Sequence, residues 1–87
     1  MRAIQPTWHC LLRFRQRVKI GRGTEAAVAA LRESLERADL TRMPPGWIAG
    51  RERGAQMWAI DHDLAYPLSP GPNGAWTAAT VLKRGAR

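Results

Sequence analysis

The chain has 87 residues, which is enough for one domain with a thin hydrophobic core. This length excludes large cofactor folds such as a nucleotide-binding doubly wound sheet or a TIM barrel. The 14 Lys and Arg residues outnumber the 7 Asp and Glu residues, and the resulting net charge of +7 favours an anionic partner, with nucleic acid first and a membrane surface second.

The first predicted helix extends from Thr7 to Val18. Its apolar residues follow spacings of three and four, which is typical of one buried helix face: Trp8, Leu11, Phe14 and Val18. Thr7 is a favourable N-cap residue, and Gly21 and Gly23 interrupt the pattern afterwards.

The second predicted helix follows Thr24, which we interpret as its N-cap. Glu25 lies in the first turn, where the helix dipole favours an acid. An apolar stripe follows at helical spacing, made of Val28, Leu31, Leu35 and Ala38. The helical part of the chain is therefore expected over about residues 6–40.

Four short strands are predicted in the second half, at 47–49, 55–60, 65–68 and 76–82. In the last of these, alternation predicts that Trp76, Ala78, Thr80 and Leu82 share one face. We therefore expect a single α+β domain over 1–87, with two N-terminal helices packed on a small, mostly antiparallel four-stranded sheet at about 47–84.

The positive charge is concentrated near the N-terminus. Residues 1–22 contain no acid and six basic residues, namely Arg2, Arg13, Arg15, Arg17, Lys19 and Arg22. Residues 23–50 carry a net charge of −1, and residues 51–87 carry +2. We interpret the first 22 residues as the main part of an anion-binding surface, with a merely solubilising surface as the alternative.

His9, Arg13 and Arg17 are spaced by four residues, so they form one row along the first helix. Arginine binds phosphate bidentately, and histidine exchanges a proton near neutral pH. Cleavage of RNA by its own 2′-hydroxyl group requires a base, an acid and cations that stabilise the phosphorane, but no metal. The alternative is a solvated, arginine-rich helix face whose histidine only caps or packs.

Cys10 is the only cysteine, so the chain forms no intramolecular disulfide and no multi-cysteine zinc site. We therefore expect a reducing, cytoplasmic setting. No apolar stretch typical of a secretory signal is found near the start. The longest uncharged run, residues 64–82, contains Pro67, Pro70 and Pro72, so no membrane-spanning helix is expected there.

Residues 8–18 read WHCLLRFRQRV, and residues 80–85 read TVLKRG. This layout resembles small actinobacterial and phage proteins that carry a histidine, then RFRxRV, and end on TxLxRG. Those proteins are in turn similar to the barnase–colicin–RelE superfamily of metal-independent ribonucleases, many of which are toxins of toxin–antitoxin pairs. The resemblance spans most of the chain.

The resemblance implies N-terminal helices packed on an antiparallel sheet, and it implies site residues. The family histidine would be His9, the helix arginines Arg13 and Arg17, and the last-strand residues Thr80 and Arg84. Arg51 or Arg53 would share their cleft, and no cofactor or metal is implied. The glutamate base of the barnase branch has no clear equivalent, and Glu52 is the one acid near a strand end.

Further residues are candidates for nucleic-acid contacts: Arg15, Lys19, Arg22, Trp47, Arg51, Arg53 and Lys83. Trp47 is interpreted either as a core residue or as a base-stacking residue, whereas Trp8, Trp58 and Trp76 are expected in the core. The sequence Asp61-His62-Asp63 favours a turn over a metal site, because His62 would point away from the two acids. Cys10 is expected to be a small buried or edge residue.

Two functions remain open on the sequence. The first is a toxin-like, metal-independent endoribonuclease that cleaves RNA, in which His9 acts as base or acid. The second is a non-catalytic phage or host regulatory module of the same fold that binds nucleic acid or a host protein. The expected partners are RNA and an acidic antitoxin or host protein. A membrane-surface role of the first helix is less favoured, because Arg15 interrupts its apolar stripe.

Overall fold

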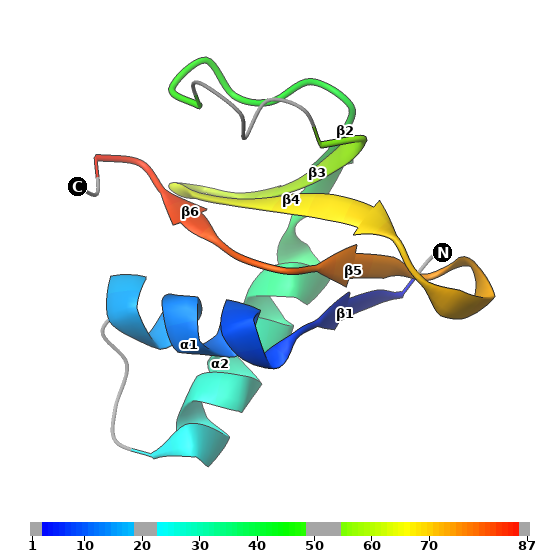
Figure 1. The fold of residues 1–87 in the computed structure, drawn as a ribbon. Helices are drawn as coiled ribbons and strands as arrows, with labels where there is room; N and C mark the ends of the chain where they lie inside the picture. The colour runs from blue at the N-terminus through cyan, green and yellow to red at the C-terminus, as the bar shows by residue number, and fades with distance from the viewer. Residues whose placement is uncertain (1–2, 19–22, 49–54, 86–87) are drawn as a thin grey trace.

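A computed structural model describes residues 3–18, 23–48 and 55–85 of the chain. In these residues two helices, α1 (Trp8–Arg17) and α2 (Thr24–Arg37), lie on one side of a six-stranded sheet (Figure 1). The strands are β1 (Ile4–Pro6), β2 (Asp39–Thr41), β3 (Met57–Asp61), β4 (Leu64–Pro70), β5 (Trp76–Ala78) and β6 (Leu82–Lys83), and a 3₁₀ turn lies at Pro72–Gly74. The predicted α+β class is confirmed.

The sheet is mixed, with the strand order β1-β5-β4-β3-β2 and with β6 beside β4. β1 is parallel to β5, and the other pairs are antiparallel. The prediction of four strands after both helices is therefore wrong in number and in position, and the mostly antiparallel sheet is mixed because β1 is parallel to β5. β1 and β2 have three residues each, which is too short for a visible alternating pattern, and Pro6 in β1 opposes a strand assignment.

The two helices begin close to their predicted positions. Thr7 is the N-cap of α1, and its Oγ1 accepts a hydrogen bond from the backbone N–H of Cys10 at 3.1 Å. α2 begins at Thr24 itself, and its N-cap is Gly23, whose φ of 94° is readily adopted only by glycine. The prediction that Thr24 is the N-cap is therefore wrong by one residue.

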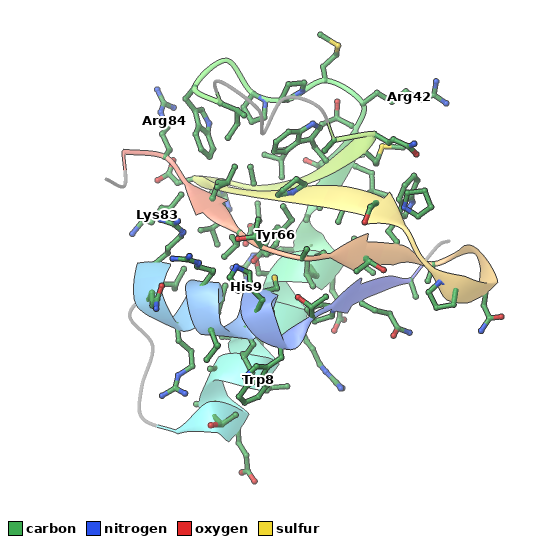
Figure 2. The ribbon with its side chains drawn as sticks, in the orientation of Figure 1. Trp8, His9, Arg42, Tyr66, Lys83 and Arg84 are labelled. Carbon is green, nitrogen blue, oxygen red and sulfur yellow. The ribbon has the colours of Figure 1, made fainter. Side chains whose placement is uncertain are left out.

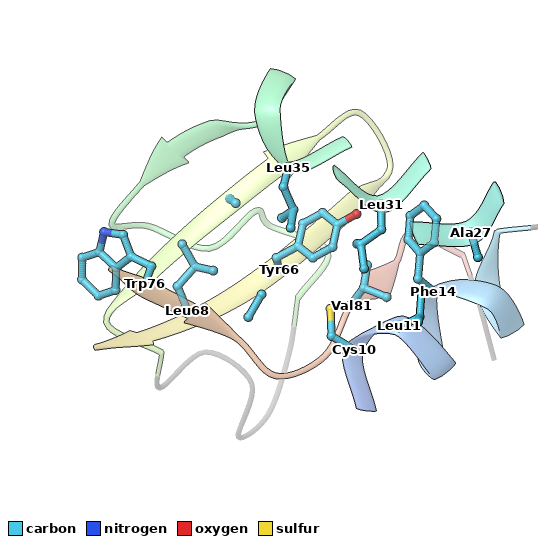
Figure 3. Close-up of a cluster of buried hydrophobic side chains, with 12 residues drawn as sticks. Cys10, Leu11, Phe14, Ala27, Leu31, Leu35, Tyr66, Leu68, Trp76 and Val81 are labelled. Atoms are coloured by element: carbon cyan, nitrogen blue, oxygen red, sulfur yellow. The ribbon is translucent and has the colours of Figure 1, made fainter. Parts of the chain in front are cut away.

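Both faces of the sheet are covered. Successive residues of β3 and β4 alternate between a main cluster on the helix side and a smaller cluster on the far side. The main cluster contains Cys10, Leu11, Phe14, Ala27, Leu31, Leu35, Ala59, Tyr66, Leu68, Trp76, Ala78 and Val81 (Figure 3). The smaller one contains Ile48, Trp58 and Ala65. The core positions predicted for Trp58 and Trp76 are confirmed, with exposed fractions of 0% and 7%.

The last predicted strand is interrupted by a β-bulge. Leu68 of β4 pairs with Ala78, whereas Ala65 pairs with Leu82, so two residues of β4 face the three residues 79–81. The extra residue shifts the alternation by one position.

The bulge corrects the predicted faces of the last strand. Val81 is fully buried on the helix side together with Ala78, whereas Leu82 packs against the far cluster. Lys83 pairs with Leu64, whose side chain packs on the helix side, so the Lys83 side chain also lies on that side. Thr80 is half-buried within the bulge.

The strand predicted at 47–49 is not formed in its described part. Trp47 lies in a turn, Ile48 has no regular structure, and the backbone N–H of Ile48 donates to the carbonyl of Pro45 at 3.0 Å. Residue 49 lies outside the described residues. Pro44 and Pro45 favour a turn here because their fixed φ angles and missing N–H groups disfavour a strand.

A polar network attaches α2 to the sheet. Ser34 Oγ donates to Asp61 Oδ2 at 2.6 Å and lies 2.7 Å from the hydroxyl of Tyr66, and Arg37 Nε donates to Asp61 Oδ1 at 2.9 Å. Because Ser34 directs its one proton at the carboxylate, the Tyr66 hydroxyl donates to Ser34. Asp61 ends β3, and His62, at φ 53°, follows it in the turn that was predicted for this segment.

A candidate nucleic-acid interface on helix α1

Helix α1 is attached to the sheet at its N-terminal end. The backbone N–H of Thr7 donates to the carbonyl of Ala78 at 3.0 Å, and the Thr7 hydroxyl donates to the carbonyl of Ala79 at 3.3 Å. Cys10, Leu11 and Phe14 then form the buried side of the helix. These contacts determine which side of α1 faces solvent.

His9 and Arg13 are exposed and in contact on that solvent side. Arg13 Nε donates to His9 Nε2 at 3.4 Å, and Arg13 Nη1 donates to Gln16 Oε1 at 3.3 Å. In this contact Nε2 of His9 is the acceptor and the guanidinium is the donor. The predicted row of residues 9, 13 and 17 therefore exists, and its first two side chains touch.

Arg17 continues the row at the C-terminal end of α1, where it is half-buried. Its carbonyl oxygen accepts a hydrogen bond from Lys83 Nζ at 3.3 Å, and this contact joins β6 to the helix (Figure 2). Cations are favoured at a helix C-terminus, because the carbonyl groups there carry partial negative charge. The bulge in residues 79–81 allows this contact, since it places Lys83 on the helix side.

Trp8 and Leu12 form an exposed apolar ridge on α1, with exposed fractions of 65% and 38%. At about 100° per residue, Arg15 flanks this ridge on one side, and His9 with Arg13 flanks it on the other. The expectation that Trp8 is a core residue is wrong. The apolar spacing of α1 includes Trp8, but Cys10 and Leu11 occupy the buried side of the first turn, and Trp8 lies well away from Cys10 and Phe14 around the helix.

Beside Trp8 the surface is hollowed into a groove of about 680 Å³. Residues 3–8 form one wall, and α2 with its following residues forms the other. Most lining side chains are apolar, among them Ile4, Val28 and Leu40, and Gln5 and Thr7 are among its polar groups.

Three of the predicted site residues do not join this face. The Arg84 side chain points away from α1, although its neighbour Lys83 points toward it (Figure 2). Trp47 is half-buried against the cluster on the far side of the sheet. Thr80 lies in the bulge, and no hydrogen bond of its side chain is seen among the described residues.

Four predicted nucleic-acid contacts lie outside the described residues, and these are Lys19, Arg22, Arg51 and Arg53. Glu52, the acid considered as a general base, is outside them as well.

Cys10 is fully buried, as expected of a small core residue, and burial raises the pKa of its thiol to about 12. The thiol is therefore protonated at neutral pH, although it is next to His9 in the sequence. Within the described ranges, no three His, Cys, Asp or Glu side chains converge as they would around a metal ion. No helix in the same ranges is long and apolar enough to cross a membrane.

Comparison with models of protein families, with curated proteins and with solved structures finds no match for this chain. The site is therefore defined by its own geometry. Sequence reasoning identified the row on α1 but missed the exposure of Trp8 and the contact made by Lys83. Several sides of α1 carry apolar residues, and only the packing of the helix reveals that Cys10, Leu11 and Phe14 are buried while Trp8 is exposed.

Proposed function

We propose that this protein binds RNA through a basic face made of His9, Arg13, Arg17 and Lys83. The observation that carries the proposal is the hydrogen bond from Lys83 Nζ to the Arg17 carbonyl, because it brings a second element to the helix row. Two exposed cationic side chains, Arg13 and Lys83, are thereby held near one helix, and α1 itself contains no acid.

This arrangement suits a phosphodiester backbone. Guanidinium groups bind phosphate oxygens through paired hydrogen bonds, and an ammonium group adds a compact charge. Neutralised phosphates release condensed counterions, so such binding has a characteristic salt dependence. As an RNA-directed protein, the chain would act in the cytoplasm, and an acidic protein such as an antitoxin would compete with RNA for the same cations.

The test is the affinity for a labelled single-stranded RNA, measured against salt concentration for three matched variants. Arg13→Gln and Lys83→Gln each remove one phosphate contact, so each should weaken binding roughly 3- to 5-fold at physiological salt. Each should also lower the slope of log K against log salt by about 0.7.

Arg42→Gln is the matched control. Arg42 is exposed and lies at a different end of the molecule from α1 (Figure 2). Its removal changes the net charge as much as the other two substitutions do, so it measures the effect of overall charge alone. Equal losses in all three variants would show that RNA contacts no particular face, and the proposed site would then be wrong.

A second candidate function, metal-independent cleavage of the bound RNA, is favoured by the His9–Arg13 hydrogen bond. It keeps an imidazole beside a guanidinium that can hold a phosphate. When Arg13 turns from His9 to the phosphate, Nε2 of His9 is free to take the proton of a 2′-hydroxyl, whose oxygen attacks the adjacent phosphorus. The bond from phosphorus to the 5′-oxygen then breaks, and that oxygen takes a proton from water, which leaves a 2′,3′-cyclic phosphate and a 5′-hydroxyl.

The chain contains a matched histidine for this test, because His62 is exposed in the β3–β4 turn and lies on a different element from His9 and Arg13. His9→Asn should lower the cleavage rate about 10²- to 10⁴-fold in the presence of EDTA, with RNA affinity largely retained. His62→Asn should cleave at the wild-type rate, since asparagine tolerates the positive φ of that position. Cyclic phosphate ends are measured on the fragments, and cleavage by His9→Asn at the wild-type rate would exclude His9 as the catalytic group.

A further inference from the structure

The most unusual feature of α1 is the exposure of Trp8. Its indole is 65% exposed, although tryptophan side chains are on average highly buried. Leu12, one turn later on the same ridge, is 38% exposed. Within the described residues these two make the largest apolar exposure on either helix, and an exposed aromatic group on an ordered element is a common feature of binding surfaces.

The charges beside the ridge identify the chemistry of its ligand. Trp8 is next to His9 in the sequence, and the two side chains leave α1 in different directions (Figure 2). On the helix surface Arg13 lies beyond His9, and Arg15 lies on the opposite flank of the ridge. An indole between cationic groups can bind a ligand in which flat rings alternate with negative charges. A nucleic-acid strand has this chemistry, because each nucleotide carries a base and a phosphate.

The groove beside Trp8 adds space for a ring. Its volume of about 680 Å³ and its mostly apolar walls would accept a planar heterocycle lying against the indole. Gln5 lines the same groove, and its side-chain amide can hydrogen-bond with the polar edge of a base. Arg32 and Glu36 line the wall on α2 and offer a further donor and acceptor.

We infer that Trp8 is a stacking platform for a base of single-stranded RNA whose phosphates lie on the basic face. The inference rests on the proposed function and adds the class of RNA. In a duplex the bases are stacked on each other and are not available to an indole, whereas a single strand can turn its bases outward. A double-stranded RNA would reach only the cations of this face.

A protein segment is the competing occupant of the ridge. A protein that covers Trp8 and Leu12 would have to place acids opposite arginines on both flanks. A nucleic-acid strand carries a phosphate charge at every nucleotide and can therefore place negative charge on both flanks. The arginines beside the ridge thus favour RNA over a protein segment. The experiment distinguishes the two, because only RNA stacking makes RNA affinity depend on the indole.

The test compares Trp8→Ala and Trp8→Phe with the wild type, using labelled oligoadenylate both as a single strand and annealed to oligouridylate. Trp8→Ala should weaken single-strand binding about 5- to 150-fold, the loss of one base–aromatic stack. Its salt slope should equal the wild-type slope, because no phosphate contact is removed. Trp8→Phe should retain most of the affinity, and duplex affinity should be the same for all three proteins.

Met43→Ala is the matched control, since Met43 is 69% exposed and lies outside α1. This variant should bind the single strand as the wild type does. Wild-type affinity in Trp8→Ala, together with a loss in Arg13→Gln, would overturn the stacking role and leave the basic face intact. Absence of RNA binding by the wild-type protein would instead overturn both, and equal losses on single strand and duplex would overturn the single-strand assignment.

Discussion

At the scale of single residues, Asp61 carries the strongest electrostatic constraint. Its carboxylate is 5% exposed, and it receives hydrogen bonds from Ser34 and Arg37. Burial alone raises the pKa of this group, but the two hydrogen bonds and the positive charge of Arg37 outweigh burial, so the pKa is lowered from its ordinary value of 3.8. Burial also raises the pKa of the neighbouring Tyr66, which keeps its hydroxyl protonated as a donor.

We predict that Asp61→Asn lowers the free energy of unfolding by about 1–3 kcal/mol at neutral pH, the range for hydrogen bonds to a buried charged group. A carboxylate whose folded pKa is lowered stabilises the fold above its unfolded pKa, and this stabilisation is lost as the pH falls through the folded value. The difference between the variant and the wild type should therefore shrink below pH 3.8. Urea unfolding at several pH values measures this difference in the free energy of unfolding. A difference that does not change with pH would contradict the stabilising role of the Asp61 charge.

At the scale of elements, the bulge between β5 and β6 decides which side chains reach the helix side. Ala79 and Val81 would share one face in a regular strand. In the structure Ala79 is exposed and Val81 is fully buried, because the extra residue lies between the two halves of the strand. The same shift brings Lys83 to the helix carbonyl and thereby assembles the basic face.

Because of the bulge, we expect substitutions at residues 79 and 81 to differ in their effect on the free energy of unfolding. Val81→Ala should lower the free energy of unfolding by about 2–3 kcal/mol, because two buried methyl groups are replaced by a cavity. Ala79→Ser should change it by less than about 0.5 kcal/mol, as expected of an exposed position. Similar effects at both positions, measured by urea unfolding, would indicate a regular strand in solution.

At the scale of the whole molecule, the chain has a radius of gyration of 12.1 Å, close to the roughly 12 Å expected for a compact chain of this length. Two apolar layers flank the sheet, so a small domain buries residues from both of its faces. Helix α1 is anchored at both ends, to β5 through Thr7 and to β6 through Lys83. Its cations are thus held in one place despite their mutual repulsion, and RNA phosphates would relieve that repulsion.

Much of the fold is visible in local sequence patterns. The spacing of Leu11, Phe14 and Val18 identifies α1, Thr7 marks its first turn, and the stripe of α2 is unambiguous. Two strands, β3 and β4, also lie close to their predicted ranges. The short strands at the two sheet edges escape prediction, because three residues form a strand only when a long-range partner supplies their hydrogen bonds.

The candidate site, like the fold, is determined partly by local sequence and partly by tertiary structure. The contact between His9 and Arg13 follows from helix geometry and four-residue spacing, and the sequence by itself determined it together with the helices and the excess of positive charge. Tertiary structure alone decided that Trp8 is exposed, that Lys83 joins the basic face and that Arg84 turns away. Helical periodicity is a property of neighbouring residues, whereas burial and the register of a bulged strand depend on partners that are distant along the chain.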